Sequence, residues 1–319
     1  MNSWKNLKRN LAQRFLDRCV LRPNRDPIPC ENLIRCPIDH PDVAANPHSP
    51  DIPRSNVQTE AYVFTTRQDG KLPPLPQPNT TSGTPQEAPQ HLAIKFPGTG
   101  GRAERSSEAP LNLLYPNLAN TTHPPGQHVE VWTWNPPGYG QSTPPARLVD
   151  QADFARDFAR QVAAASSGPH TQLWLVGNSL GCLSVLHLAA NLDAWLPEGF
   201  PRNQVGCWLR NPPDLAEVVL RVSRRYHAER FMRRVVQCLP SNLDAVQNAS
   251  HSPSPAVFLA SQKDRLVLPE LQARIHQAYR GDKRIVPLEG LDHDGLLEEQ
   301  HVPLVVSASH WLADQTKPK

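Results

Sequence analysis

The sequence lacks a long uninterrupted run of apolar residues. No stretch of about 18 apolar positions occurs in it, so no transmembrane helix is expected. Basic residues interrupt the N-terminal segment, which therefore has no apolar core of the kind found in a cleaved signal peptide. These absences predict a cytoplasmic location. The basic residues concerned are Lys5, Lys8, Arg9, Arg14 and Arg18.

Closely paired cysteines and a strong net charge are also missing. The six cysteines are scattered and lack the short paired spacings of a zinc site, which argues against a metal centre. Cys30 and Cys36 are close enough in sequence for a local disulfide, although free thiols in a reducing compartment fit the scattered pattern better. The other cysteines are Cys19, Cys182, Cys207 and Cys238.

The formal net charge of +3 gives no reason to expect a nucleic-acid partner.

Glycine is scarce beside proline, at 16 residues against 35, and the prolines gather in long connections that should be extended or irregular. Residues 21–56 are rich in Pro, Asn and Asp and are predicted to form an irregular arm. Residues 70–90 are of low complexity and are predicted to form a mobile loop. We therefore expect an N-terminal segment over residues 1–56 and one folded domain over residues 57–319.

Residues 3–20 carry apolar side chains at spacings of three and four and are predicted to form an amphipathic helix. Basic residues lie between the apolar ones, which is also typical of helices that lie on a membrane surface. The favoured interpretation is a helix on the domain surface with a solvated charged face, and peripheral membrane contact is the alternative. The apolar stripe consists of Trp4, Leu7, Leu11, Phe15 and Cys19.

From residue 91 on, short apolar runs alternate with amphipathic stretches. This alternation predicts an α/β fold with a mostly parallel sheet covered by helices on both faces. In such sheets functional residues gather at the carboxyl ends of the strands. The predicted strands cover residues 91–96, 128–134, 171–177, 204–209, 256–260 and 283–288, after an early strand at 57–66. The predicted helices cover residues 148–165, 180–192, 212–225, 268–279 and 302–314.

The strand at 171–177 leads into the sequence GNSLG, residues 177–181, which matches the pattern G-x-S-x-G. The pattern alone is weak, but here an apolar strand precedes it and a helix follows it. That context is typical of a sharp turn that lifts a nucleophilic serine above the sheet edge. Ser179 is therefore the candidate nucleophile, and its alternative role is to cap the following helix.

A serine hydroxyl needs a base to take its proton, and in this fold class an acid and then a histidine follow the serine along the chain. Asp264 follows the fifth regular strand and is the candidate acid, with Asp214 as the runner-up. His293 follows the last strand and is the candidate base. Asp292 and Asp294 flank it, but adjacent residues rarely point in the direction that the histidine requires.

The first regular strand ends at the turn PGTGG, residues 97–101. A glycine-rich turn there can point a backbone N–H at a developing oxyanion. We expect the N–H groups of Thr99 and Leu180 to form the oxyanion hole, and a simple tight turn is the alternative. Residues 135–142 suit a compact turn near the site, in which Tyr139 either lines the substrate pocket or packs in the interior.

Together these segments resemble the α/β-hydrolase superfamily over about residues 57–315. The PGTGG turn, the NPPGYGQS turn and the GNSLG elbow carry the resemblance in that order, and the SQKDRLV and GLDHDG segments complete it. More narrowly, the chain resembles the bacterial ABHD12/ABHD13/ABHD17 (Bem46)-like group. The resemblance implies hydrolysis of carboxylic esters or thioesters through a covalent acyl-enzyme, without a cofactor. One departure is Pro97, which stands where the family usually has histidine.

The connection between the strands at 204–209 and 256–260 is longer than one crossover helix requires. The family resemblance implies that such an insertion forms a lid, so we expect a lid over about residues 212–250. Arginines crowd into residues 221–234, which suggests attraction to an acidic substrate or an anionic membrane. A solvated helix face is the favoured interpretation.

The sequence thus predicts a serine hydrolase that acts on a small-molecule acyl ester or thioester, with Ser179, His293 and Asp264 as its catalytic triad. Two alternatives stay open at this point: a peptidase on the same triad, and a non-catalytic binding protein on the same fold. No obligate protein partner is evident from the sequence.

Overall fold

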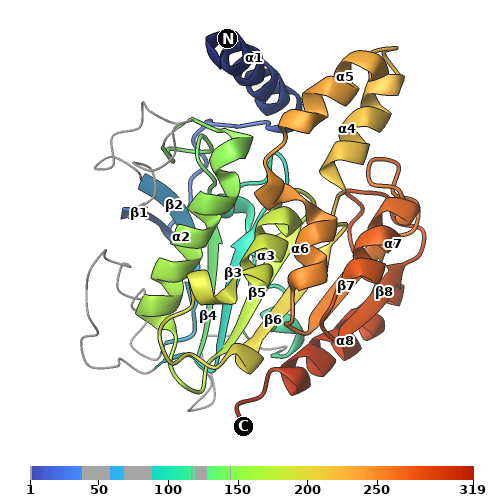
Figure 1. Ribbon diagram of the computed structural model, residues 1–319. Coiled ribbons are helices and arrows are strands. Elements are labelled where there is room, and N and C mark those ends of the chain that lie inside the picture. Colours follow the sequence, from blue (N-terminus) through green and yellow to red (C-terminus); the bar gives the residue numbers. More distant parts are fainter. Residues whose placement is uncertain (1, 38–57, 68–87, 116–117, 119–127, 144) are drawn as a thin grey trace.

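The computed structural model describes residues 2–37, 58–67, 88–115, 118, 128–143 and 145–319, and for residues 2–7 it describes the backbone only. Eight strands form one sheet in the order β1-β2-β4-β3-β5-β6-β7-β8 (Figure 1). Strands β3 to β8 all pair in parallel, and only β2 runs antiparallel to its two neighbours. The prediction of a mostly parallel sheet is therefore confirmed.

The seven predicted strands are all present, with bounds within one or two residues of those expected. Strands β4, β5, β6 and β7 are buried almost throughout, which explains their nearly continuous apolar sequences. These strands are β2 (Gln58–Thr65), β3 (His91–Phe96), β4 (Val129–Trp134), β5 (Gln172–Asn178), β6 (Val205–Arg210), β7 (Ala256–Ser261) and β8 (Lys283–Leu288).

Helices cover both faces of the sheet and divide the interior into two apolar clusters. One cluster packs α2, α3, α6 and α7 against one face, and Figure 1 shows α2, α3 and α6 lying over it. The other packs α8 against the opposite face. The helices are α1 (Asn2–Val20), α2 (Leu148–Ser166), α3 (Gly181–Ala190), α4 (Leu215–Arg224), α5 (Glu229–Val235), α6 (Ala245–His251), α7 (Pro269–Ala278) and α8 (Val302–Gln315).

The first 37 residues differ from the prediction in two ways. The segment predicted to be an irregular arm contains a strand, β1 (Leu33–Pro37), which pairs antiparallel with β2. In α1, Leu16 is buried against the domain, whereas Leu11 and Phe15 of the predicted apolar stripe are 58% and 41% exposed. The helix therefore packs on the domain through the side that carries Leu16, which is offset by one residue from the predicted stripe that carries Phe15.

The predicted lid segment is divided between two places. Helices α4 and α5 lie beside α1 at one end of the molecule, where the parallel strands end (Figure 1). Helix α6, in contrast, packs against α3 and contributes Ala245 and Ala249 to the core. The covering part of the insertion is therefore α4 and α5.

Other predictions concern segments that the structure covers only in part. The low-complexity loop predicted at 70–90 lies outside the described residues up to residue 87, as does the arm from residue 38 on. All six cysteines are free thiols, so Cys30 and Cys36 are unpaired. Among the described helices, none combines the length and the apolar character needed to cross a bilayer.

Candidate active site

Ser179 lies directly after β5, on a turn so sharp that its backbone takes a φ of 48°. A positive φ strains any residue with a side chain, and such strain gathers at functional sites. The flanking glycines make the turn possible. A Cβ on Gly181 would overlap the Phe96 carbonyl oxygen, and one on Gly177 would lie 2.7 Å from the Cys182 Cα. These contacts leave no room for a side chain at either position.

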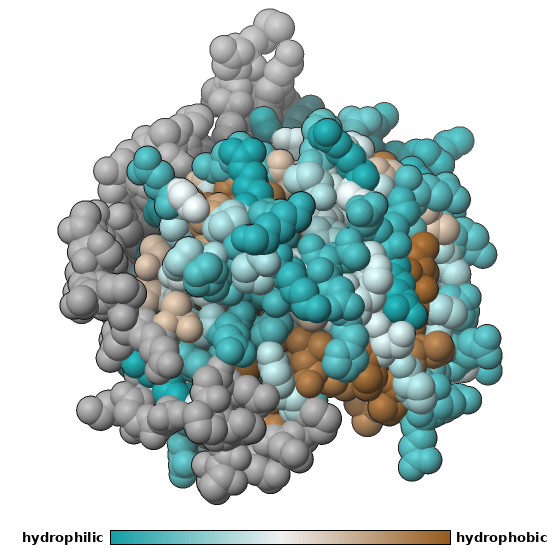
Figure 2. All heavy atoms as spheres, turned by 90° about the horizontal axis from the view of Figure 1, so that it is seen from below, coloured by the Kyte–Doolittle hydropathy of each residue, from teal (hydrophilic) through white to brown (hydrophobic). Residues whose placement is uncertain are grey.

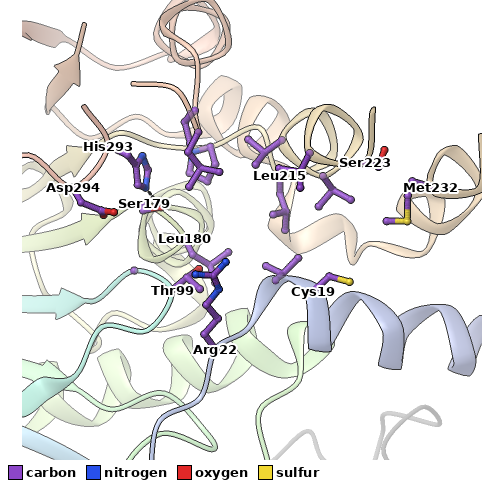
Figure 3. Close-up of a pocket in the computed structure, with 18 of the residues that line it drawn as sticks. Cys19, Arg22, Thr99, Ser179, Leu180, Leu215, Ser223, Met232, His293 and Asp294 are labelled. Atoms are coloured by element: carbon purple, nitrogen blue, oxygen red, sulfur yellow. Dashed lines mark hydrogen bonds between the residues drawn. The ribbon is translucent and has the colours of Figure 1, made fainter. Parts of the chain in front are cut away.

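The structure brings Ser179, His293 and Asp264 into one hydrogen-bonded chain, although 114 positions separate Ser179 from His293 in the sequence. The Ser179 Oγ lies 2.8 Å from His293 Nε2, and His293 Nδ1 lies 2.7 Å from Asp264 Oδ2. Figure 3 shows the contact between serine and histidine at one end of a pocket. The three side chains come from loops after β5, β7 and β8, as the rule on strand ends predicts.

The acid of this chain is held from several sides. Asp264 is 2% exposed, and its Oδ1 accepts the backbone N–H groups of Leu266 and Val267, each at 2.8 Å. These bonds leave Oδ2 directed at the histidine. The runner-up acid lies elsewhere: Asp214 caps α4 by accepting the Glu217 N–H and forms an ion pair with Arg274 at 3.1 Å. The structure thus pairs His293 with Asp264 and not with Asp214.

Two residues that the sequence analysis did not single out hold the histidine loop. Asn211 is fully buried just after β6, has a φ of 50°, and donates through Nδ2 to the His293 carbonyl oxygen at 3.1 Å and to the Ser261 Oγ at 3.0 Å. Its Oδ1 accepts the Ser261 N–H at 2.9 Å. Arg210 donates to the Gly295 carbonyl oxygen on the other side of His293. The signal available in the sequence was their position at the end of a buried strand.

Arg210 also contributes charge beneath the site. Burial lowers the pKa of its guanidinium, and the nearby carboxylates of Asp294, Asp264 and Asp292 oppose that shift. Its carbonyl oxygen accepts the Ser179 N–H at 2.8 Å, so the same residue anchors the serine turn as well. Arg210 therefore links the serine turn to the loop that carries His293.

The PGTGG turn lies against the serine turn, as expected for an oxyanion hole. Gly98 approaches so closely that a Cβ there would lie 2.9 Å from the Asn178 carbonyl oxygen and 3.1 Å from the Ser179 Cβ. Thr99 and Leu180 both line the pocket beside Ser179 (Figure 3). Within the described part of the chain, neither of their backbone N–H groups donates to a protein acceptor. Both remain available to a bound oxygen atom.

A pocket of about 520 Å³ begins at Ser179 and His293 and extends between α1 and α4 (Figure 3). Its far walls are almost entirely apolar. Cys19 and Val20 of α1 face Leu215, Val219 and other residues of the α4–α5 segment across it. The other apolar residues of α1 and of the α4–α5 segment that line the pocket are Phe15, Val218, Val222, Tyr226, Ala228 and Met232.

The two alternatives for Tyr139 are resolved in favour of packing. Its side chain is 1% exposed, lies outside the pocket lining, and accepts the Arg22 N–H at 3.2 Å through its hydroxyl oxygen. It therefore fastens the chain just after α1. Over the described ranges, no group of three or more His, Cys, Asp or Glu side chains is arranged to hold a metal ion.

Comparisons with known proteins agree with this architecture. A profile of the "Alpha/beta hydrolase family" matches residues 87–308. An esterase from Pyrococcus furiosus superposes with a TM-score of 0.53 at 11% sequence identity, covering 93% of this chain and 97% of the esterase. Est1E from Butyrivibrio proteoclasticus, solved with ferulic acid bound, gives a TM-score of 0.51 at 13% identity and covers 81% and 96% of the two chains. A search of curated protein sequences gives no significant match. At these identities the structural likeness concerns the fold.

Proposed function

Because the chain belongs to the alpha/beta hydrolase family, we propose that it is a serine hydrolase that cleaves a carboxylic ester or thioester with an apolar acyl group. One observation carries the proposal: the hydrogen-bonded chain Ser179–His293–Asp264 lies at one end of an apolar pocket. The same observation favours a hydrolase over a binding protein, because a binding protein needs no polarised serine beside its pocket.

The first step is acylation. With Nδ1–H donating to Asp264, the Nε2 atom of His293 is free to accept the proton of the Ser179 hydroxyl at 2.8 Å. As the proton leaves, Oγ attacks the acyl carbon of the ester and forms a tetrahedral intermediate. The imidazolium then gives its proton to the leaving group, at the oxygen of an alcohol or the sulfur of a thiol. An acyl-serine is left.

The second step is deacylation. A water molecule donates its proton to His293 and attacks the acyl carbon, after which Ser179 recovers its proton and the free acid leaves. In both steps negative charge develops on the acyl oxygen. The backbone N–H groups of Thr99 and Leu180 beside Ser179 are the donors that would stabilise it.

The acyl group fits the far part of the pocket. Burying apolar surface there gains roughly 25 cal/mol per Å², so longer chains should bind more tightly until the pocket is full. The polar leaving group would remain near Ser179, Arg22 and Asp294 at the polar end of the same pocket. The narrower assignment to the ABHD12/ABHD13/ABHD17 (Bem46)-like group stays part of this proposal and rests on the sequence motifs alone.

The direct test uses p-nitrophenyl esters of increasing acyl length on the wild type and on Ser179→Ala. We expect the wild type to turn over the esters with an optimum above the shortest chain, since the pocket extends away from Ser179. The variant should lose about 10⁴-fold or more in kcat, because the nucleophile is gone. Parallel assays with thioesters and aminoacyl anilides separate an esterase from a thioesterase or a peptidase.

Ser184→Ala is the matched control for this test. Ser184 lies in α3, fully buried and outside the pocket lining, so its loss should leave turnover near the wild-type level. Equal activity in Ser179→Ala and the wild type, with both proteins folded, would overturn the proposal. So would the absence of turnover on every class of substrate.

A further inference from the structure

Large apolar side chains stand exposed at the mouth of the pocket. Tyr226 is 76% exposed, Leu11 and Phe231 are each 58% exposed, and Phe15 and Val222 are 41% and 38% exposed. We call these five residues the apolar rim. Exposed aromatic and aliphatic side chains gathered in one place on a protein surface mark an interaction site more often than isolated ones do.

The apolar rim is continuous with the pocket. Phe15, Val222 and Tyr226 belong to it and line the cavity as well. The ring of Phe15 meets that of Phe231 edge to face, with centroids 5.7 Å apart and planes at 84°. Leu11 lies one helical turn before Phe15 on the same side of α1. A molecule that covers the rim would therefore also meet the opening of the pocket.

Basic residues surround the rim. Residues 8–20 of α1 and residues 215–235 of α4 and α5 contain ten basic side chains against three acidic ones. Ion pairs within this surface neutralise only part of that charge. The pairs there join Glu229 to Arg224 and to Arg233. The basic side chains are Lys8, Arg9, Arg14, Arg18, Arg221, Arg224, Arg225, Arg230, Arg233 and Arg234, and the acidic ones are Asp17, Glu217 and Glu229.

Three exposed arginines of this surface differ from Arg224 and Arg233 in their ion pairing. Arg225, Arg230 and Arg234 have no acidic partner among the residues that the structure describes. Guanidinium groups that stay unpaired around exposed aromatic rings suit a partner that offers anionic oxygens next to apolar matter. An anionic lipid bilayer offers both, because the phosphates of its headgroups lie next to its acyl chains.

The structure points to a lipid-docking surface: we propose that the apolar rim and its surrounding arginines bind the face of an anionic lipid bilayer. The rim side chains enter the boundary between headgroups and acyl chains, and the arginines pair with lipid phosphates. The pocket mouth then opens toward the bilayer. The position fits the shape of the molecule, since α1, α4 and α5 stand together at one end of it (Figure 1).

The opposite end of the molecule has a different character. Figure 2 views the molecule from that end, where hydrophilic side chains cover most of the coloured surface and apolar ones form one large brown patch and smaller brown areas. Two ion pairs lie near the amino ends of the strands and the C-terminus: Arg202 with Asp193, and Lys317 with Asp314. These charges supply a control for any general effect of lowering the positive charge of the protein.

The test measures binding of the full chain to vesicles of phosphatidylcholine mixed with an equal amount of phosphatidylglycerol, by co-sedimentation. The wild type should bind them, and should bind vesicles of pure phosphatidylcholine at least tenfold more weakly. Replacing Arg225, Arg230 and Arg234 together by Gln should weaken binding to the anionic vesicles by about tenfold or more, because each basic residue near such a surface contributes about a fivefold factor. The control is the triple variant in which Arg202, Lys317 and Lys319 are replaced by Gln, and it should bind as the wild type does.

A second pair of variants tests the apolar part. Leu11→Ser and Phe231→Ser together should weaken binding about tenfold, since both side chains are exposed and neither lines the pocket. Leu304→Ser is the control, because Leu304 is 47% exposed on α8, which covers the opposite face of the sheet. Equal losses in the rim variant and in Leu304→Ser would overturn the proposal.

Three further outcomes decide the matter. Failure of the wild type to bind anionic vesicles would reject the lipid surface outright. Equal weakening by both charge variants would reject it too, because the effect would then follow total charge and not position. Ser179→Ala should bind vesicles like the wild type, so a failure of the proposed ester hydrolysis and a failure of lipid docking are separate results.

Discussion

Two regions meet at the pocket, and they are built differently. The Ser179–His293–Asp264 side rests on the ends of buried strands, with Asp264 2% exposed and tied to two backbone N–H groups. The facing side consists of α1, α4 and α5, where Phe231 is 58% exposed and Tyr226 is 76% exposed. One region is buried and fixed by hydrogen bonds, whereas the other exposes large apolar side chains.

This difference separates two tasks. Proton transfer requires atoms held within a few tenths of an ångström, which buried strand ends supply. Selection and entry of an apolar chain require area and room to adjust, which helices with exposed apolar side chains supply. Substitutions on the first side should therefore change the rate of the chemical step, whereas those on the second should change which substrate binds and where the protein binds.

The largest expected effect in the comparison belongs to the buried acid. Asp264→Asn should lower kcat by about 10³- to 10⁴-fold, because a neutral amide no longer favours the tautomer and charge state that His293 needs. The measurement is steady-state turnover of the best p-nitrophenyl ester.

The control for this substitution is the other candidate acid. Asp214→Asn should keep kcat within about twofold and lower stability by less than about 1 kcal/mol, because asparagine can still accept the Glu217 N–H and only the ion pair with the exposed Arg274 is lost. If Asp214→Asn stops turnover and Asp264→Asn does not, the assignment of the acid is wrong.

A smaller effect is expected from the support of the histidine loop. Asn211→Ala removes the bonds to the His293 carbonyl oxygen and to Ser261. We expect kcat to fall about 10- to 100-fold with KM nearly unchanged, and unfolding free energy to fall by about 1–3 kcal/mol. The kinetic constants and the free energy of unfolding are measured well below the melting temperature. A fall in stability with kcat unchanged would show that Asn211 has no part in positioning the base.

The smallest effect tests the helical side. Cys19→Trp puts a large ring into the α1 wall of the pocket, so kcat/KM for long-chain esters should drop about 5- to 10-fold relative to short-chain esters. Asn10→Trp, on an exposed part of the same helix outside the lining, should leave the ratio unchanged. Equal ratios for both variants would mean that acyl chains do not enter between α1 and α4.

The same division explains what the sequence could predict. The serine turn, the acid and the histidine each follow a buried strand, and such strands are recognisable from their apolar runs and their lengths. Pairing Ser179 with His293 and Asp264 needed two further rules: parallel strands end at one edge of the sheet, and the acid and then the histidine follow the serine along the chain. Fold class and candidate triad therefore followed from local patterns.

Other features depend on contacts that no local pattern reveals. Strand β1 is five residues long with Pro37 at its end, and it exists because β2 offers a partner. Asn211 acts through a bond across 82 positions of the chain. In α1 the spacing predicted the helix, but two neighbouring stripes were both apolar enough to face the domain. Leu16 is the one that is buried, which leaves Phe15 at the pocket mouth.

The most direct test of the account is to map the site of covalent modification by a fluorophosphonate probe. The protein is labelled, digested and analysed by mass spectrometry, since the probe reacts with a serine only when a neighbouring base activates it. We predict a single phosphonylated peptide that carries the adduct on Ser179, and its loss in His293→Ala. An adduct on another residue, or unchanged labelling of Ser179 in the absence of His293, would contradict the central claim that these two side chains act together.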